Sequence, residues 1–541
     1  MSSRPSLHAA ALVAASLLTA CGEPAPPPAP AEIVGGTEPD EQPEPTQAPV
    51  QADSPWSGEL MSKAPRDLVA TGRPAPETVA DRSAPDVVLI TIDTWRADRL
   101  GVHGSPRAAT SKTLAEWAAG GVLFDSAWAP ASWTWPTMSS LVTGLYPSAH
   151  GAVGPSSGLC DAPATLAEVF HQSGRRTGFA GSNAYFEPPG PAPVDSGFGQ
   201  GFEFYWARGL EAGPRVIEFA SWFLEGIAED PSFLHLHLFD PHCPYDAPAD
   251  VIASVAKPRF GHTGGHERVS AAFPAAVRAT GACHFLPVVE LGLPDREIAE
   301  MNPDTDLQAY LDAYDAGLVV TDDLLADIQA LLMKHGRWEN SWIVVTGDHG
   351  EEFGDHGRLG HGKSVYAETS RVPLLIRPPL GADGWARGAR VATPVSLVDL
   401  APTLATVTGL PAPTVWQGRD LAPALRGEAI EAAPVLSETD YETTARLIVA
   451  DGLALHRDLT DGRRLYDLAQ DPFMSAPLAS ESEDTKRLIA PLEARLGDEE
   501  RRIAKGRMCQ GEGRAMTPQQ LENLRALGYL GDADPTPTGA P

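Results

Sequence analysis

The stretch DVVLITID, residues 86–93, decides the fold of this chain. Residues 87–92 are apolar or β-branched, and this short run is followed by polar residues. The pattern is typical of a strand that is buried on both faces of a parallel sheet. Two similar runs occur later, Phe233–Phe239 and Trp342–Thr346. The sequence therefore predicts at least three buried strands of one sheet.

Helical patterns separate these strands, as in Thr165–Ser173 and Leu311–His335. Strands that alternate with helices predict an α/β fold, with a mostly parallel sheet flanked by helices. After Pro394 the pattern changes: residues 396–409 are expected to form a helix, and short β-rich runs between Ala433 and Leu468 predict a small C-terminal sheet.

Composition limits the function. The chain has 541 residues, of which 43% are hydrophobic, so it can bury a large core, and its formal net charge is −30. Such a charge argues against nucleic acid as a partner and against electrostatic binding to anionic lipid. An anionic substrate would need a local positive centre, which a bound metal ion could supply.

The N-terminus carries an export signal. Arg4 precedes the small and apolar run Ala9–Leu18, which is too short to span a bilayer. Residues 18–21, LTAC, resemble a bacterial lipobox, which implies cleavage before Cys21 and lipid attachment to its sulfur. The alternative is ordinary secretion with an incidental cysteine. We expect an exported protein that is lipid-anchored in the bacterial cell envelope, in the periplasm or at the outer membrane.

The chain divides into five parts. Residues after Cys21 are rich in Pro, Ala, Glu and Thr and are expected to be disordered, because they bury too little apolar surface to offset the entropy of ordering. The expected parts are a signal peptide (1–21), a Pro-rich tether (22–84), a catalytic domain (85–430), a C-terminal subdomain (431–531) and a disordered tail (532–541).

Four further cysteines could form disulfides in an oxidising compartment. They are Cys160, Cys243, Cys283 and Cys509, for which three pairings are possible. No pair has Cys-x-x-Cys spacing, so structural roles are favoured over zinc binding.

Each buried strand is followed by acidic residues or histidines. These are Asp93 after the first, Asp240 and His242 after the second, and Asp348 and His349 after the third. A single Asp-His pair could be a helix cap beside a surface histidine. Three such strand ends favour a metal site, because ligands bind at the carboxyl ends of parallel strands and metal-dependent hydrolases draw carboxylates and imidazoles from several of them.

Several segments resemble the sulfatase family within the alkaline-phosphatase superfamily. They are DVVLITIDTWRADRLGVHG (86–104), SWTWPTMSSLVTGLYPSAHG (132–151), FDPHCPY (239–245), TGDHGEEFGDHGRLGHGKSVYAETSRVPLLIR (346–377), PVSLVDLAPTLATVTGLP (394–411) and RRLYDLAQDP (463–472). The resemblance implies an alkaline-phosphatase-like fold and a hydrolase of sulfuric or phosphoric esters.

The chain departs from the sulfatase pattern at the nucleophile. The family has a Cys or Ser that becomes formylglycine two positions before a Pro, and an Arg two positions after that Pro. Here Thr134 precedes Pro136 and Met138 follows it. Threonine cannot become formylglycine by that route, so the resemblance implies that the Thr134 hydroxyl itself attacks, activated by a metal. Alternatively, Thr134 caps the following helix.

The resemblance also implies metal ligands. Threonine-containing branches of the superfamily would hold one metal with Asp93, Thr134, Asp348 and His349. Asp240, His242 and His361 could hold a second metal. This set has one carboxylate and two imidazoles, a combination that zinc or manganese accepts more readily than calcium. In addition, Thr94 stands where sulfatases usually have a second aspartate, so the usual calcium site would lack a carboxylate. Alternatively, His242 and His361 contact the anionic oxygens of the substrate.

Lys363 stands where sulfatases bind the anion with a lysine, or it is an exposed surface residue. The expected substrate is a small-molecule, glycan or lipid-linked anionic ester. Two other functions stay open: a phosphoglycerol or phosphoethanolamine transferase of the same superfamily, and a binding protein that kept the fold without catalysis.

Overall fold

The computed structural model describes residues 62–526, apart from 66–67, 72, 107, 189–196, 210–212, 244, 246, 256–302, 442, 459–461, 481, 512 and 514–515. Cys21, Cys283, the signal peptide and the tail lie outside the described residues, so the lipid anchor stays a prediction. No helix among the described residues combines the length and the apolar character needed to cross a bilayer.

A mostly parallel sheet of ten strands forms the centre of the described chain, as the sequence predicts. Its strand order is β1 (Val69–Ala70), β5 (Phe204–Ala207), β4 (Arg176–Gly181), β6 (Ser232–Leu238), β2 (Asp86–Ile92), β7 (Ser341–Gly347), β10 (Arg371–Arg377), β3 (Val122–Trp128) and β11 (Ala389–Val391), with β12 (Val395–Ser396) also paired to β3. Strands β2, β6 and β7 are buried along their whole length, which explains their continuous apolar sequence.

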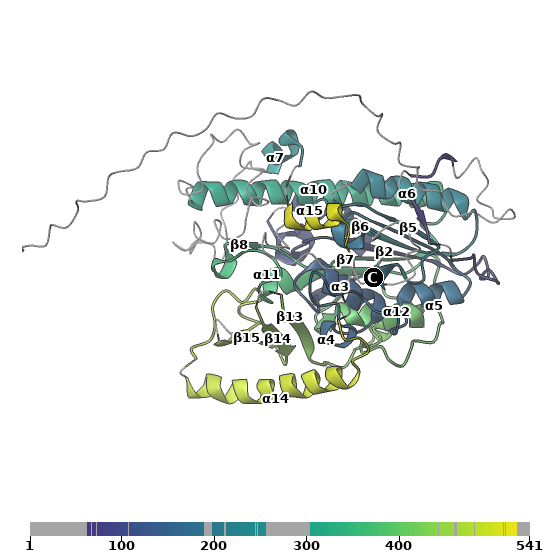
Figure 1. The fold of residues 1–541 in the computed structure, drawn as a ribbon. Helices are drawn as coiled ribbons and strands as arrows, with labels where there is room; N and C mark the ends of the chain where they lie inside the picture. The colour runs from purple at the N-terminus through teal and green to yellow at the C-terminus, as the bar shows by residue number, and fades with distance from the viewer. Residues whose placement is uncertain are drawn as a thin grey trace, which may run out of the picture. The chain divides into compact units, whose positions relative to one another are not determined.

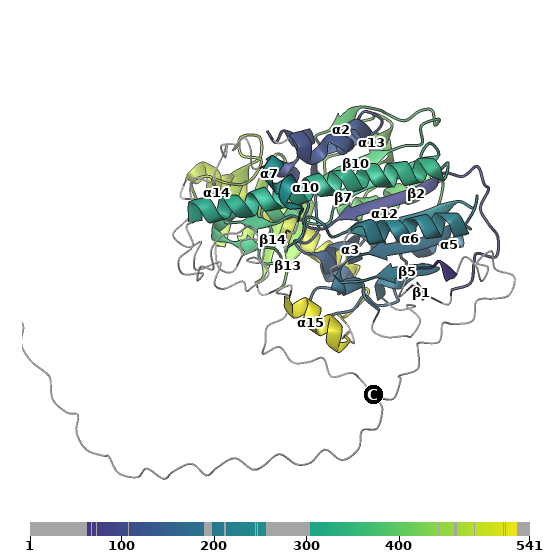
Figure 2. The same ribbon diagram turned by 90° about the horizontal axis from the view of Figure 1, so that it is seen from above.

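Helices cover both faces of this sheet (Figure 1). Helices α6 (Gly213–Gly226) and α10 (Pro303–Lys334) lie on one face, and α3 (Thr134–Thr143), α5 (Leu166–Gln172) and α12 (Leu400–Val407) lie on the other. Figure 2 shows α10 running across the sheet beside α6. The sheet is therefore covered on both faces, which leaves the carboxyl ends of its parallel strands as the place where a ligand is expected to bind.

The predicted tether ends earlier than expected. Val69 and Ala70 form β1, which pairs with β5 at the sheet edge, and the Thr71 hydroxyl donates to the Phe202 carbonyl at 2.7 Å. These residues were expected in the tether, and instead they extend the sheet. Two residues are too short a strand for an apolar pattern to reveal.

The predicted C-terminal sheet is present. It contains β13 (Val435–Thr439), β14 (Ala445–Ala450), β15 (Leu453–Asp458) and β16 (Gly462–Asp467), all antiparallel. Helix α14 (Glu483–Lys505) packs against it through Leu492, Leu496 and Ile503.

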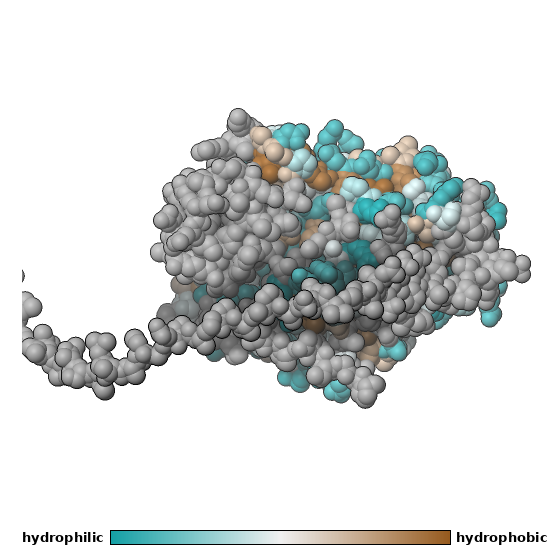
Figure 3. All heavy atoms as spheres, turned by 45° about the horizontal axis from the view of Figure 1, so that its top comes forward, coloured by the Kyte–Doolittle hydropathy of each residue, from teal (hydrophilic) through white to brown (hydrophobic). Residues whose placement is uncertain are grey.

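Figure 3 shows a hollow lined by hydrophilic residues on one face of the described chain, below a band where hydrophobic residues gather.

A stack of aromatic rings connects the C-terminal sheet to the segment after β7. The Tyr366 ring lies between His356 and His456, with ring centroids 3.7 and 3.9 Å away. His356 Nδ1 lies 2.5 Å from Glu368 Oε1, and its Nε2 lies 2.8 Å from the Met474 carbonyl. Burial lowers the pKa of His356, but the Glu368 carboxylate outweighs this and raises it to about 9. His356 is therefore a buried cation that binds two parts of the chain.

A disulfide joins Cys160 to Cys509 across 349 residues. Cys243 is disulfide-bonded as well. The bond between Cys160 and Cys509 fixes the segment after α14 to the catalytic domain.

Loss of this disulfide should destabilise the protein. We expect Cys160→Ser with Cys509→Ser to lower the free energy of unfolding by about 2–4 kcal/mol, because the unfolded chain gains conformational entropy when this long loop is no longer closed. Urea denaturation without reductant measures this. An unchanged midpoint would show that the bond adds no stability.

Stability should fall as the pH rises from about 6.5 through about 9, the ordinary and folded pKa values of His356. Because the folded pKa is raised, the pair with Glu368 contributes fully below the lower value and is lost above the higher one. Glu352, whose pKa burial and Glu368 raise to about 8, acts in the same direction.

Replacing His356 tests this assignment. Asparagine is chosen because it tolerates the positive φ of 50° at this position. His356→Asn should weaken the pH dependence of the unfolding midpoint without abolishing it, because the contribution of Glu352 remains. A pH profile identical to that of the wild type would contradict the role of His356.

Candidate active site

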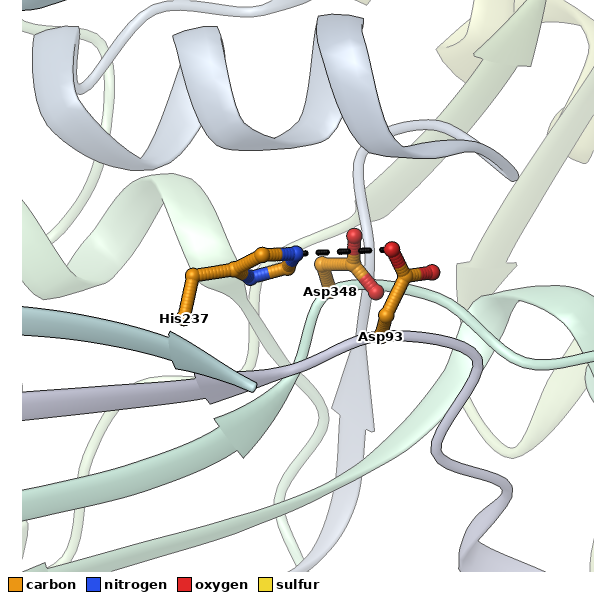
Figure 4. Close-up of side chains that lie close together, drawn as sticks. All are labelled: Asp93, His237 and Asp348. Atoms are coloured by element: carbon orange, nitrogen blue, oxygen red, sulfur yellow. Dashed lines mark hydrogen bonds and ion pairs between the residues drawn. The ribbon is translucent and has the colours of Figure 1, made fainter. Parts of the chain in front are cut away.

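Two buried carboxylates form the centre of the candidate site. Asp93 directly follows β2 and Asp348 directly follows β7, two adjacent parallel strands. Both side chains are fully buried, and with His237 of β6 they offer ligand atoms within 4.8 Å of one another (Figure 4). The strand ends thus bring these two predicted ligands together.

The Thr134 hydroxyl lies against the same group. Thr134 is the first residue of α3, and its Oγ1 lies 3.2 Å from His349 Nε2 and 3.5 Å from Asp93 Oδ2. The N-cap position of α3 belongs to Trp133, so the hydroxyl of Thr134 faces the carboxylate rather than capping the helix. The helix N-terminus also favours a bound anion here.

His349 presents one nitrogen to the group. Its Nδ1 lies 2.8 Å from the Gly350 carbonyl, which fixes the proton on Nδ1. Its Nε2 lies 3.4 Å from Asp93 Oδ1 and 3.6 Å from Asp348 Oδ2. Burial and the nearby His361 lower the pKa of His349 to about 3, so the ring is neutral with a lone pair on Nε2.

The electrostatics of the two carboxylates call for a cation. Burial and the charge of Asp93 raise the pKa of Asp348 well above its ordinary value. Burial acts on Asp93 in the same way, but His242 and His237 hold its pKa below the ordinary value. The pKa values of the two acids are thus shifted in opposite directions, as expected for two carboxyl groups that share a buried site.

The donor set fits a divalent metal ion. Among the described residues, Asp93 Oδ1 and Asp348 Oδ2 are buried and accept no hydrogen bond. Together with His349 Nε2 and Thr134 Oγ1 they offer oxygen and imidazole ligands, a set that zinc and manganese accept.

The residues predicted for a second metal are arranged differently. Asp240 accepts the Gly213 backbone N–H with both carboxylate oxygens, at 3.1 and 3.0 Å, so it caps α6. His242 and His361 do lie near the site: their ring centroids are 5.2 Å apart, and His361 lies 4.5 Å from His349. Lys363 is half-buried two residues beyond His361.

Three neighbours of the site were not predicted. Asn183 follows β4, and its Nδ2 donates to Asp93 Oδ2 at 2.9 Å. Glu351 is buried and holds His361 Nδ1 at 2.9 Å and the Tyr245 hydroxyl at 3.1 Å. His237 had a signal in the sequence, because histidine is unusual inside a buried strand. Asn183 had none.

The sequence of this chain is similar to those of known proteins. A family model described as Sulfatase matches residues 85–410. The chain is 23% identical over 434 residues to the uncharacterized sulfatase YidJ of Escherichia coli, covering 72% of this chain and 82% of that protein. It is 26% identical over 372 residues to an ulvan-active sulfatase of Formosa agariphila, covering 64% of this chain and 66% of that protein.

Solved structures share the fold. A phosphonate monoester hydrolase of Agrobacterium radiobacter superposes with a TM-score of 0.60 at 22% identity, covering 79% of this chain and 97% of its own. A protein solved with D-glucosamine-2-N,6-O-disulfate superposes with a TM-score of 0.64 at 19% identity, covering 78% of this chain and 98% of its own.

The turn that carries Asp348 and His349 has no room for a side chain at Gly350. A Cβ there would lie 1.9 Å from the Glu368 carbonyl oxygen. We expect Gly350→Ala to push this turn away and to cost about 1–3 kcal/mol of stability. Gly381→Ala is the matched control, because nothing lies within 4 Å of its Cβ position. Equal urea midpoints for the two variants would contradict the expectation.

Proposed function

The chain belongs to the sulfatase family and is a sulfuric or phosphoric ester hydrolase, and we propose that Thr134 is its nucleophile. The observation that carries the proposal is the position of Thr134 Oγ1, 3.2 Å from His349 Nε2 at the start of α3. Serine or cysteine, from which formylglycine would be made, does not stand here. The hydroxyl is the only nucleophilic atom of residue 134.

We propose that Asp93, Thr134, Asp348 and His349 hold one divalent cation. When bound, the cation would lower the pKa of the Thr134 hydroxyl and neutralise the charge of the ester. The Thr134 hydroxyl loses its proton and Oγ1 forms a bond to sulfur or phosphorus, while the bond to the leaving oxygen breaks and that oxygen gains a proton and departs as an alcohol. Water then splits the threonine ester, which releases the sulfate or phosphate group and returns a proton to Thr134 Oγ1.

His242 and His361 are proposed to contact the ester oxygens rather than a second cation. Asp240 would be the only carboxylate of that second site, and both its oxygens already accept the Gly213 N–H. His242 Nδ1 is held by the Cys243 carbonyl at 2.7 Å, while its Nε2 is buried and has no partner among the described residues. The negative charge of a bound ester would favour the doubly protonated ring, whose Nε2–H could then donate to an ester oxygen.

Phosphate esters are the favoured substrates. Met138 stands where sulfatases have an arginine, and its side chain is fully buried, so this position offers the sulfate group no charge. The relatives include both ulvan-active sulfatases and phosphonate monoester hydrolases, which supports an anionic ester, free or on a glycan.

Replacement of Thr134 tests the nucleophile. We expect Thr134→Ala to reduce turnover of an aryl phosphate, phosphodiester or sulfate by about 10³-fold or more, because no other atom can replace the attacking oxygen. Initial rates with added Zn²⁺ or Mn²⁺ measure this, and Thr134→Ser should retain part of the activity.

Thr143→Ala is the matched control. Thr143 is a buried threonine in the last turn of the same helix, and its hydroxyl donates to the Ser139 carbonyl at 2.6 Å. If Thr134→Ala were as active as Thr143→Ala, Thr134 would not be the nucleophile.

A further inference from the structure

A row of polar side chains runs through the buried centre of the sheet behind the candidate site. Thr91 lies in β2, His235 and His237 lie in β6, and all three are fully buried. Thr91 is paired in register with His237, and residues two apart on a strand share a face, so Asp93 continues the row. Buried polar groups are costly unless they are hydrogen-bonded, so this row is unexpected in strands that are otherwise mostly apolar.

The three side chains form a continuous hydrogen-bonded chain that ends on Asp93. Asp93 Oδ2 lies 3.4 Å from His237 Nε2. Thr91 Oγ1 lies 2.9 Å from His237 Nδ1 and 3.1 Å from His235 Nε2. A longer contact of 3.4 Å joins Thr91 Oγ1 to the Leu236 carbonyl. Of the residues to which the proposed chemistry assigns a role, only Asp93 belongs to this hydrogen-bonded series.

The direction of each hydrogen bond follows from the acceptor at the end. An ionised Asp93 only accepts, so His237 Nε2 carries a proton and Nδ1 a lone pair. The Thr91 hydroxyl therefore donates to His237 Nδ1 and accepts from His235 Nε2. His235 Nδ1 is then left with a lone pair, and this is the atom that has no partner among the described residues.

The surroundings of His235 agree with this direction. Its ring packs against Phe179 and Phe233, with ring centroids 5.2 and 6.4 Å away. Burial lowers the pKa of His235 well below its ordinary value, so the ring is neutral. A buried lone pair without a partner costs less than a buried N–H without one, which agrees with this direction.

We propose that His237, Thr91 and His235 are positioning residues that hold the Asp93 carboxylate in one orientation for the cation. The inference rests on the proposed function. His237 and Asn183 both bond to Asp93 Oδ2, at 3.4 and 2.9 Å, and so they leave Oδ1 free to face His349 Nε2 and Asp348. Hydrogen bonds of this kind orient metal ligands and typically strengthen metal binding by about 10–100-fold.

His237 is thus a hydrogen-bond donor and not a ligand, although its Nε2 lies close enough to both carboxylates to be one (Figure 4). A metal on Nε2 would require the proton on Nδ1. The Thr91 hydroxyl would then accept from both imidazoles, and its own proton would have only the longer contact of 3.4 Å to the Leu236 carbonyl. That arrangement replaces a hydrogen bond of 2.9 Å from Thr91 to His237 by a weaker one.

Metal titration of the chelator-stripped full chain tests the proposal. Thr91→Val keeps the shape of the side chain but removes the hydroxyl, and we expect its affinity for Zn²⁺ and Mn²⁺ to fall about 10–100-fold, measured by competition with a chromophoric chelator. Thr91→Ser should restore affinity. His235→Phe, one step further from Asp93, should cause a smaller loss.

Thr177→Val is the matched control. Thr177 is a buried threonine of the neighbouring strand β4, and its hydroxyl donates to the Gly201 carbonyl at 2.8 Å instead of reaching the site. Its urea midpoint measures the general cost of losing a buried hydroxyl, and its metal affinity should match that of the wild type. Equal metal affinities for Thr91→Val and Thr177→Val would overturn the proposal.

The number of imidazole ligands separates the two roles of His237. X-ray absorption at the zinc edge of the loaded protein should show one imidazole, that of His349, and two would overturn the donor role. A wild-type chain that binds no divalent cation would refute the proposed function as well. A chain that binds metal and hydrolyses esters, but does not respond to Thr91→Val, would refute only this inference.

Discussion

The repulsion between two buried carboxylates is the constraint on which the site depends. Asp93 and Asp348 end neighbouring parallel strands, and both are removed from water. Their carboxylate oxygens come within 4.8 Å of each other, and two negative charges that close cannot both persist in a low dielectric without a positive partner. The net charge of −30 makes it harder still for the protein surface to supply one. A bound cation would resolve the conflict, and the same cation would neutralise the charge of an anionic ester.

The fold decides which atoms would meet the proposed cation. The carboxylates are fixed by strands that are buried along their length, and Thr134 is fixed by the start of α3. The far end of α3 stops at Gly144, in the left-handed conformation, where a Cβ would lie 2.9 Å from the Trp416 ring. The end of α3 therefore packs closely against the Trp416 ring, which holds the helix in place.

Sequence patterns predicted the parts of the molecule that are long and regular. The apolar runs located β2, β6 and β7, and the polar residues that follow them located Asp93 and Asp348, because the carboxyl ends of parallel strands must meet. Asp240 shows the limit of this reasoning. It also follows a buried strand, but its oxygens accept the N–H of Gly213, which lies 27 positions earlier in the chain. No local sequence pattern predicts such a cap.

The site is built in two halves that differ in how they are held. The carboxylates follow strands of the central sheet, whereas His361 belongs to a loop and its ring is held by Glu351. The next residue, Gly362, donates its N–H to the Ser132 carbonyl, and its own carbonyl accepts a hydrogen bond from the Thr439 hydroxyl of β13. The C-terminal sheet thus supports the half that would contact the ester oxygens. Changes in that sheet would therefore act first on the half proposed to contact the ester oxygens.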